Sequence, residues 1–249
     1  MKPAYTYLSQ FYDLLMDQDH EQWCAYLIAL LEKHHHYPRT ILELGCGTGS
    51  LTIPFALQGY GVWGVDISPE MIAVAERKVE GLGCDIHFLV QDMQYLNLGD
   101  QVFDAVVSVC DAMNYLTDVQ ALKRTFESAG RHLAAGGLFL FDLNSELKLK
   151  KIYGNHSFAE YTDDFAYFWD NAYDVSTDIC EMELVFFIPI GDGIYQKTVE
   201  KHQQKLWLPS EIVELAEQTG FEILGCYDFM TDLEQSNVSE RWQFVLRKA

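Results

Sequence analysis

Three glycines in the segment Ile41–Ser50 could bring the backbone close to a ligand. The segment reads ILELGCGTGS, and Gly45, Gly47 and Gly49 follow directly on a run of branched apolar residues. Residues 40–44 have the pattern of a short buried strand, and the residues after the glycines have helical spacing. Glycine permits tight turns, and a turn that leads into a helix directs free N–H groups at a bound molecule. This pattern predicts a ligand-binding turn.

Acidic residues follow the next two predicted strands. Asp66 comes directly after the strand expected at 61–65, 21 residues beyond Gly45, a spacing suited to a carboxylate that accepts both hydroxyls of a ribose. Asp92 follows the strand expected at 86–90. Ligands of open parallel sheets bind outside the carboxyl ends of the strands, so we expect both acids to border the same cleft as the glycines.

The elements that would position these residues alternate between strand and helix through the first 145 residues. The apolar patterns predict strands at 40–44, 61–65, 86–90, 103–109 and 138–142, and helices at 68–79 and 119–133. Repeated strand–helix units build a parallel sheet that is covered on both faces. We therefore expect an α/β fold, a doubly wound and mostly parallel seven-stranded sheet of Rossmann-like type.

The rest of the chain extends this core without a linker that would mark a second domain. We expect one domain over 1–249, with an N-terminal helical cap at 1–37 and a core at 38–147. Longer strand-like stretches predict antiparallel strands inserted at 150–207, and a final helix and two strands complete the core at 208–249.

Composition limits the class of ligand. The 249 residues carry a formal net charge of −20, which disfavours a nucleic-acid substrate. No charged-then-apolar leader and no long apolar run is present, so we expect a cytoplasmic protein that does not span a membrane. The six cysteines are scattered, and the histidines at 34–36 end a predicted helix where consecutive side chains diverge, so we expect no bound metal.

The inserted region has its own charge pattern. Eight acids and no basic residue lie between Glu160 and Glu183. They form either a solvated strand face or a field that attracts a cationic or amine-bearing substrate. The aromatic residues at 165–173 could line a substrate lid, or form a sheet face or a homodimer face.

A nicotinamide or flavin dinucleotide is the competing ligand. Its fingerprint GxGxxG, placed on Gly45 and Gly47, needs a third glycine at position 50, where this chain has Ser50. A second acid in the segment QDM, after the third predicted strand, also has no standard place in dinucleotide binding. This second acid does have a place in binding if the ligand carries an adenine that lies across the strand ends.

These segments together resemble a known family. In order and spacing, ILELGCGTG, GVDIS with PEMI behind it, QDM and FDAVVSVCDAMNYL resemble the motifs of class I S-adenosylmethionine-dependent methyltransferases over residues 40–145. The start YTYLSQFYDLLM, the segment FDLNS and the inserted strands resemble a bacterial small-molecule group allied to the sugar-amine N-methyltransferases. The resemblance implies S-adenosylmethionine as cofactor, S-adenosylhomocysteine as product and a small-molecule acceptor whose identity it does not give.

The resemblance also implies roles around the methionine part of the cofactor. Gly45, Cys46 and Gly47 would pass beside it, with Glu43 orienting the loop or the α-amino group. The carbonyl of Cys110 would accept a hydrogen bond from that amino group.

A second set of roles concerns the nucleoside. Asp66 would hold the ribose hydroxyls, and Ile67 and Met71 would sandwich the adenine. Asp92 would accept from the exocyclic amine of the adenine, while the N–H of Met93 would serve a ring nitrogen.

In the allied enzymes N-terminal aromatic residues close over the sulfonium, which here indicates Tyr7, Tyr12 and Trp23. A cation held against aromatic faces gains about 0.5 to 2 kcal/mol per contact. The alternative is that these residues merely pack an N-terminal helix on the core.

Methyl transfer is an in-line displacement with a neutral thioether as leaving group, so positioning is the main contribution of the protein. An ammonium or hydroxyl acceptor must also lose a proton. The candidate bases are Asp111, after the fourth strand, and His202, on an inserted strand that could equally be structural. Asn114 and Tyr115 could hydrogen-bond the acceptor or cap the next turn.

The sequence thus predicts a small-molecule methyltransferase that uses S-adenosylmethionine and acts on a nitrogen or an oxygen. Two alternatives stay open. One is a catalytically silent protein that only binds S-adenosylmethionine, and the other is an NAD-dependent oxidoreductase.

Overall fold

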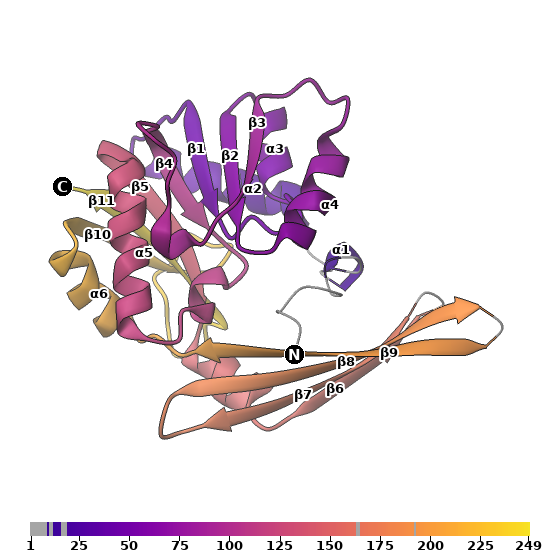
Figure 1. The fold of residues 1–249 in the computed structure, drawn as a ribbon. Helices are drawn as coiled ribbons and strands as arrows, with labels where there is room; N and C mark the ends of the chain where they lie inside the picture. Colours follow the sequence, from indigo (N-terminus) through magenta and orange to yellow (C-terminus); the bar gives the residue numbers. More distant parts are fainter. Residues whose placement is uncertain (1–8, 10–11, 16–18, 163–164, 192) are drawn as a thin grey trace.

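The computed structural model describes residues 9, 12–15, 19–162, 165–191 and 193–249. A seven-stranded sheet forms the centre of the molecule, in the order β10-β11-β5-β4-β1-β2-β3 (Figure 1). Its strands are β1 (Thr40–Leu44), β2 (Gly61–Asp66), β3 (Ile86–Val90), β4 (Phe103–Ser108), β5 (Leu133–Asn144), β10 (Phe221–Asp228) and β11 (Arg241–Lys248).

Strands β1 to β5 run parallel, and β11 pairs antiparallel with both β5 and β10. From β1 the chain first builds outward through β2 and β3, and then crosses to β4 and β5 on the other side. The strand order therefore reverses beside β1, where β4 lies on one side and β2 on the other. This is the fold class that the sequence predicted, and its switch point is the expected place for a ligand.

Helices cover both faces of this sheet, because its central strands are apolar on both sides. On one face, α5 (Val119–His132) and α6 (Pro209–Gln218) contribute to a core that includes Phe126 and Phe139. On the other, α2 (His20–Lys33) and α3 (Thr52–Leu57) contribute Leu27 and Phe55 to a second core. Each of these four side chains is fully buried.

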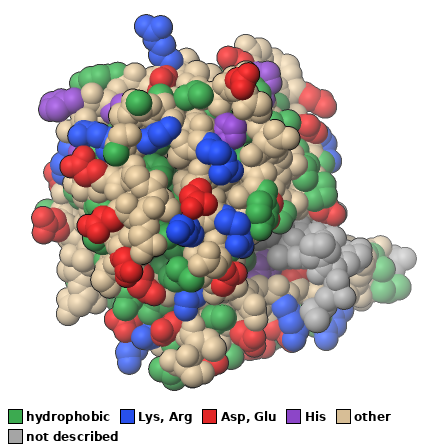
Figure 2. All heavy atoms as spheres, turned by 60° about the vertical axis from the view of Figure 1, so that its left-hand side comes forward, with side chains coloured by type: hydrophobic (Ala, Val, Ile, Leu, Met, Phe, Trp, Pro, Cys, Tyr) green, Lys and Arg blue, Asp and Glu red, His purple; other side chains and the backbone are tan. Residues whose placement is uncertain are grey.

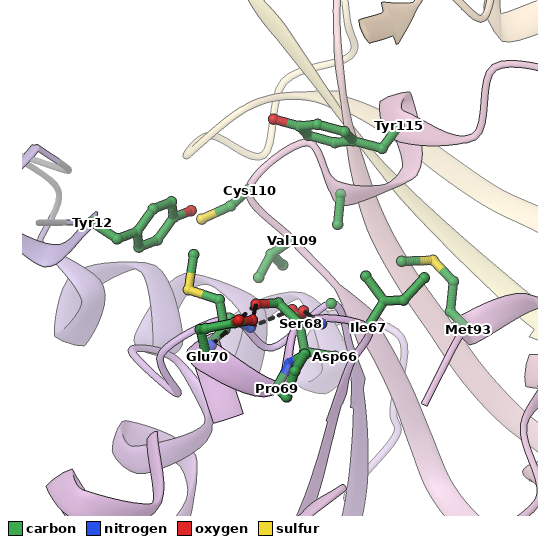
Figure 3. Close-up of a pocket in the computed structure, with 14 residues that line it drawn as sticks. Tyr12, Asp66, Ile67, Ser68, Pro69, Glu70, Met93, Val109, Cys110 and Tyr115 are labelled. Atoms are coloured by element: carbon green, nitrogen blue, oxygen red, sulfur yellow. Dashed lines mark hydrogen bonds between the residues drawn. The ribbon is translucent and has the colours of Figure 1, made fainter. Parts of the chain in front are cut away.

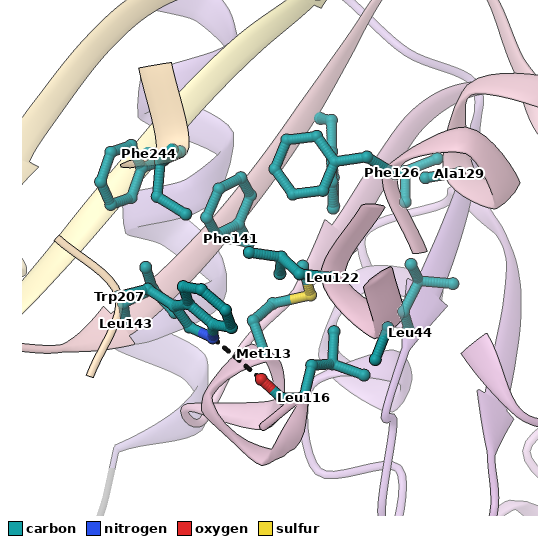
Figure 4. Packing of buried hydrophobic residues seen from close by; sticks show 14 of the residues in the cluster. Leu44, Met113, Leu116, Leu122, Phe126, Ala129, Phe141, Leu143, Trp207 and Phe244 are labelled. Atoms are coloured by element: carbon teal, nitrogen blue, oxygen red, sulfur yellow. Dashed lines mark hydrogen bonds between the residues drawn. The ribbon is translucent and has the colours of Figure 1, made fainter. Parts of the chain in front are cut away.

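The first core is densely aromatic (Figure 4). Phe141 of β5 stacks on Phe244 of β11 with ring centroids 5.1 Å apart. Trp207 is buried there and its Nε1–H donates to the carbonyl of Leu116 at 2.9 Å. A buried indole without that partner would carry an unsatisfied donor, so this bond fixes the loop after β4 against the segment that leads into α6.

The inserted residues form a separate antiparallel sheet in the order β6-β7-β8-β9. Its strands are β6 (Ser157–Tyr161), β7 (Ala166–Asp174), β8 (Ile179–Gly191) and β9 (Ile194–Lys205). Alternate residues of β8, from Cys180 to Phe186, are buried and join the first core. Figure 1 shows this sheet passing across the end of the main sheet on the side of α1 (Tyr12–Leu15).

The start of α4 agrees with the sequence prediction, whereas one helix after β5 was not predicted. Ser68 caps α4 (Pro69–Val79) with its hydroxyl and Pro69 occupies the first turn, as predicted. A π-helix at Leu147–Tyr153, between β5 and β6, was not predicted. None of the described helices combines the length and the apolar character that a membrane span requires.

Candidate functional site

A cavity of about 530 Å³ opens at the carboxyl ends of β1, β2 and β4 (Figure 3). Its walls include Gly45 and Gly47 from the turn after β1, Asp66 at the end of β2, Met93 after β3 and Cys110 after β4. The volume is in the range of pockets that enclose small molecules and cofactors. These five residues follow four different strands in the sequence, and they line the same cavity.

The glycine turn has the backbone that its sequence requires. Gly45, Gly47 and Gly49 have φ values of 70°, 54° and 74°, a region that favours glycine. A Cβ at Gly45 would lie 2.8 Å from the Cβ of Ala112, and one at Gly49 would lie 2.9 Å from the ring of Phe88. A Cβ at Gly47 would meet nothing within 4 Å. The outer glycines thus allow close packing, and the middle one leaves an open backbone at the cavity.

Asp66 joins this turn to the start of α4. Its Oδ2 accepts from the N–H of Gly47 at 2.9 Å and its Oδ1 accepts from the N–H of Ser68 at 2.8 Å. Burial raises the pKa of the Asp66 carboxyl. A carboxylate has about four lone-pair sites, so Asp66 retains the capacity to accept a further hydrogen bond from the cavity.

Glu43 lies deeper, in the middle of β1. It is buried, and its Oε2 accepts from the Thr52 hydroxyl at 2.5 Å. Burial raises the pKa of the Glu43 carboxyl to about 8. Together with Gly45 and Cys46, Glu43 lines a small recess beside the main cavity. A carboxyl with such a pKa is mostly protonated at pH 7, and a cation placed in the recess would favour its ionised form.

The β3 side of the cavity is more apolar. Met71 is buried in α4, whereas the side chain of Ile67 is 67% exposed at the cavity wall. Met93 also lines the cavity. Its neighbour Asp92 begins the short 3₁₀-helix η2 (Met93–Tyr95), where its carboxylate accepts from the N–H of Gln94 at 2.9 Å.

Comparison with known proteins decides the family. A family profile described as "Methyltransferase domain" matches residues 41–137. "Putative methyltransferase YqeM" of Bacillus subtilis is 33% identical over 246 residues, which cover 98% of this chain and 97% of that protein. The crystal structure of an S-adenosylmethionine-dependent methyltransferase from Clostridium acetobutylicum has a TM-score of 0.88 and 29% identity, over 97% of this chain and 98% of that one. The chain belongs to the S-adenosylmethionine-dependent methyltransferases.

A more distant relative has a named acceptor. The dTDP-4-amino-2,3,4,6-tetradeoxy-D-glucose N,N-dimethyltransferase of Saccharopolyspora spinosa is 25% identical over 137 residues, 54% of this chain and 53% of that protein. The cavity described above fits the cofactor of this family, because it joins an open glycine backbone to a half-buried carboxylate. The membership of the chain in this family removes the dinucleotide alternative.

One of the three aromatic residues expected over the cofactor lies at the cavity of the methyltransferase. Tyr12 of α1 lines it, and burial raises the pKa of its phenol. Tyr7 falls outside the described residues. The expectation for Trp23 needs correction, because its indole is buried in the core under α2, 4.8 Å from the ring of Phe229. It packs the helix instead of facing the cavity, the alternative that the sequence had left open.

Helix α1 is tied to the glycine turn through Asp13. The Asp13 carboxylate accepts from the hydroxyls of Thr48 at 2.5 Å and Ser50 at 2.9 Å, and pairs with the Lys78 ammonium at 2.8 Å. These contacts hold Tyr12, the preceding residue, at the cavity wall.

The expectation that Asp111 acts as a base also needs correction. Its Oδ1 pairs with Nη2 of Arg241 at 2.7 Å, and its Oδ2 accepts from Nε2 of Gln204 at 2.5 Å. Both oxygens are thus occupied by donors, one of them in a largely buried ion pair. The structure makes Asp111 an anchor that joins β11 and β9 to the turn after β4.

Asp142 completes this anchor and was not selected from the sequence. Its carboxylate accepts from the N–H groups of Cys110 at 3.2 Å and Asp111 at 2.6 Å, and it pairs with Nη1 of Arg241 at 2.9 Å. Cys110 and Asp111 have φ values of 56° and 52°, so two consecutive non-glycine residues are held in the left-handed region. A charged residue inside the apolar run FLFDLN was the available signal.

His202, the other predicted base, lies one side chain away from the cavity. It is buried on β9, and its Nδ1 is 3.2 Å from the hydroxyl of Tyr115, which lines the cavity. Asn114 has a structural role. Its Nδ2 donates to the carbonyl of Lys205 at 2.9 Å, and its Oδ1 accepts from the N–H of Asn144 at 2.9 Å. Asn114 therefore fixes the 3₁₀-helix η3 (Ala112–Tyr115) between β9 and β5.

Proposed function

We propose that this methyltransferase transfers the methyl group of S-adenosylmethionine to the amine nitrogen of a small molecule. The observation that carries the proposal is the pair of tyrosines, Tyr12 and Tyr115, which line the cavity on the side of Cys110 (Figure 3). A phenol oxygen can accept a hydrogen bond from an N–H group, and the face of a tyrosine ring attracts cations. This wall of the cavity therefore suits an ammonium group. An acceptor there would lie next to the part of the cavity that we assign to the sulfonium.

The charge of the protein supports an amine-bearing acceptor. The formal net charge is −20, and the segment Glu160–Glu183 contains acids without a basic residue. Figure 2 shows acidic side chains spread among basic ones over one face of the molecule. The relative from Saccharopolyspora spinosa, whose name specifies an amino sugar, supports the same class of acceptor.

For the nucleoside we propose the following contacts. Asp66 accepts from the two ribose hydroxyls through the lone pairs that its bonds to backbone N–H groups leave free. Ile67 and Met71 pack against the adenine, and the accessible wall formed by Ile67 supports this placement. Asp92 accepts from the exocyclic amine of the adenine and the N–H of Met93 serves a ring nitrogen.

For the methionine part we propose that Gly45, Cys46 and Gly47 pass beside it. Glu43 in the recess faces the α-ammonium, and the carbonyl of Cys110 accepts a hydrogen bond from it. Support comes from the recess itself, which Glu43, Cys46 and Cys110 line together.

When bound, S-adenosylmethionine supplies an activated methyl group whose leaving group is a neutral thioether. The leaving group needs no acid, so the protein contributes position and the exclusion of water. Tyr12, held by the contacts of Asp13 in α1, would close the cavity over the reacting atoms. We place this activity in the cytoplasm, which the six unpaired cysteine thiols support.

The decisive experiment supplies labelled S-adenosylmethionine together with the dialysable metabolites of a bacterial extract. We expect label in an amine-bearing compound, identified after chromatographic fractionation. Label in a hydroxyl compound would replace the amine by an oxygen acceptor, and no label in any fraction would favour a protein that only binds the cofactor.

A binding measurement tests the cofactor contacts separately. S-adenosylhomocysteine at 100 times its dissociation constant should stabilise the fold by about 2.7 kcal/mol, which raises the melting midpoint by roughly 5 to 10 °C. Asp66→Ala should abolish this shift. A full shift in the variant would contradict the placement of the ribose.

A further inference from the structure

Three side chains form a chain of polar contacts that leads from β9 to the cofactor cavity. The hydroxyl of Tyr115, at the cavity wall, lies 3.2 Å from Nδ1 of His202. Nε2 of the same imidazole lies 3.4 Å from Oε2 of Glu200. The imidazole thus has a phenol at one nitrogen and a carboxylate at the other.

Burial makes these contacts chemically significant. The side chains of His202 and Glu200 are each only 2% exposed. A buried carboxylate is costly unless a cation or a donor faces it, and a protonated His202 ring would be such a cation. Nδ1 can accept from the Tyr115 hydroxyl in the tautomer that leaves its lone pair free, and Nε2 is the ring nitrogen on the side of Glu200.

The backbone around the chain restricts its movement. Glu200 and His202 are alternate residues of β9, so both project to the same side of the inserted sheet. Asn114 bonds η3, and with it Tyr115, to β9 and β5. Tyr115 and His202 also pack edge to face, with ring centroids 5.9 Å apart. The phenol is consequently held between the imidazole and the cavity.

We propose that Glu200, His202 and Tyr115 form a proton relay that activates the acceptor, with Tyr115 as the catalytic residue and the other two as positioning residues that act through it. The proposal rests on the proposed function, since it requires an acceptor that must lose a proton before methyl transfer. It adds the path that this proton takes.

The relay conserves protons and charge. As the N–H bond of an ammonium acceptor breaks, its proton forms an O–H bond with Tyr115 and the phenol proton moves to Nδ1 of His202. The amine then has a lone pair for the in-line displacement described above, and Tyr115 is again neutral. The positive charge lies on the imidazolium of His202, where the Glu200 carboxylate stabilises it.

The relay takes the place that Asp111 cannot fill. Both Asp111 oxygens are occupied, one by Arg241 and the other by Gln204. Nδ1 of His202, by contrast, faces the Tyr115 hydroxyl at the cavity wall, and a carboxylate oxygen of Glu200 lies 3.4 Å from Nε2.

The test compares Tyr115→Phe, His202→Gln and Glu200→Gln with the full-length wild type. The acceptor pool is the dialysable metabolite fraction, and the rate is measured with labelled S-adenosylmethionine at saturation. General base catalysis contributes about 10² to 10⁴-fold, so we expect His202→Gln and Tyr115→Phe to lower the turnover rate about 100-fold or more. We expect a loss of about 10-fold for Glu200→Gln. The dissociation constant of S-adenosylhomocysteine, from calorimetry, should stay within about 2-fold for all three.

Two further measurements separate a relay from a structural role. His35→Gln and Glu217→Gln alter exposed residues away from the cavity and should retain the wild-type rate. Added imidazole should restore activity to a His202→Gly variant, because it can take the proton from Tyr115, whereas an uncharged ring without a basic nitrogen should not.

The outcomes are distinguishable. A wild type that transfers no label removes the proposed function and the relay with it. An active wild type whose Tyr115→Phe and His202→Gln variants keep their rate leaves the function intact and overturns the relay. If the variants lose both their rate and their binding of S-adenosylhomocysteine, and imidazole does not restore activity, the contacts among Glu200, His202 and Tyr115 are structural. That result would also overturn the relay.

Discussion

Replacing Glu43 by glutamine should make the protein more stable at high pH. Glu43 is buried in β1, and burial raises the pKa of its carboxyl from 4.5 to about 8. Below pH 4.5 the carboxyl is protonated in both the folded and the unfolded chain and has no effect. Between these two pKa values the unfolded chain loses the proton while the folded chain retains it. The free energy of unfolding therefore falls as pH rises and levels off above about 8.

The difference between the ordinary pKa of 4.5 and the pKa of about 8 in the folded chain sets the size of the change in the free energy of unfolding. At about 1.4 kcal/mol per pKa unit, the whole transition is worth about 5 kcal/mol, and about 3 to 4 kcal/mol of it falls between pH 5 and pH 8. Glutamine has nearly the same shape, retains an oxygen to accept from the Thr52 hydroxyl and has no proton to lose. The variant should lack this part of the pH dependence.

Urea unfolding at a series of pH values measures the effect. The difference in the free energy of unfolding between Glu43→Gln and wild type should grow in favour of the variant by about 3 to 4 kcal/mol from pH 5 to pH 8. Glu127→Gln, an exposed glutamate on α5, is the matched control and should give a difference that is nearly constant with pH. A constant difference for Glu43→Gln as well would refute the reasoning, because the carboxyl would then titrate alike in both states.

Three other substitutions test the packing around the site. Lys78→Met removes the ion pair with α1 and should speed the dissociation of S-adenosylhomocysteine by about 2- to 5-fold, measured by stopped flow, since a partly exposed pair contributes less than about 1 kcal/mol. Arg241→Met leaves Asp142 buried without its cation and should lower the free energy of unfolding by about 3 to 5 kcal/mol. An equal loss in the Asp142→Asn, Arg241→Met double variant would contradict this explanation, because that variant has no unpaired buried carboxylate. Gly49→Ala should destabilise more than Gly59→Ala in thermal unfolding, by about 1 to 3 kcal/mol, because both positions have positive φ but only the first Cβ would meet a phenylalanine ring of β3.

The parallel half of the fold was predictable because its signals are local. Buried strands such as Thr40–Leu44 are short apolar runs, and Ser68 with Pro69 marks a helix start through bonds within one turn. Because these strands run parallel, their carboxyl ends lie at the same edge of the sheet. Gly45 and Asp66, selected from different strand ends, consequently line one cavity.

The π-helix Leu147–Tyr153 could not be predicted in the same way. Its apolar and basic residues follow no period that differs clearly from an α-helix, and its form depends on packing against strands β7 and β8 of the inserted sheet. Trp23 illustrates the same limit at the level of one side chain. Its position on α2 was correctly expected to be helical, but only the sheet behind it decides whether the indole faces the cavity or the core.

The chemistry of an ionisable residue depends on contacts that lie far along the chain. Asp111 follows β4, where a base would be expected, yet Gln204 and Arg241, 93 and 130 residues further on, occupy its oxygens. His202 has no motif around it, yet Tyr115, 87 residues earlier, connects it to the cavity. The sequence did not separate these two candidate bases, because the contacts that distinguish them form only once β9 and β11 are in place. The proposed cofactor contacts lie on the core and the proposed proton acceptor lies on an inserted strand, so separate substitutions can test the two tasks.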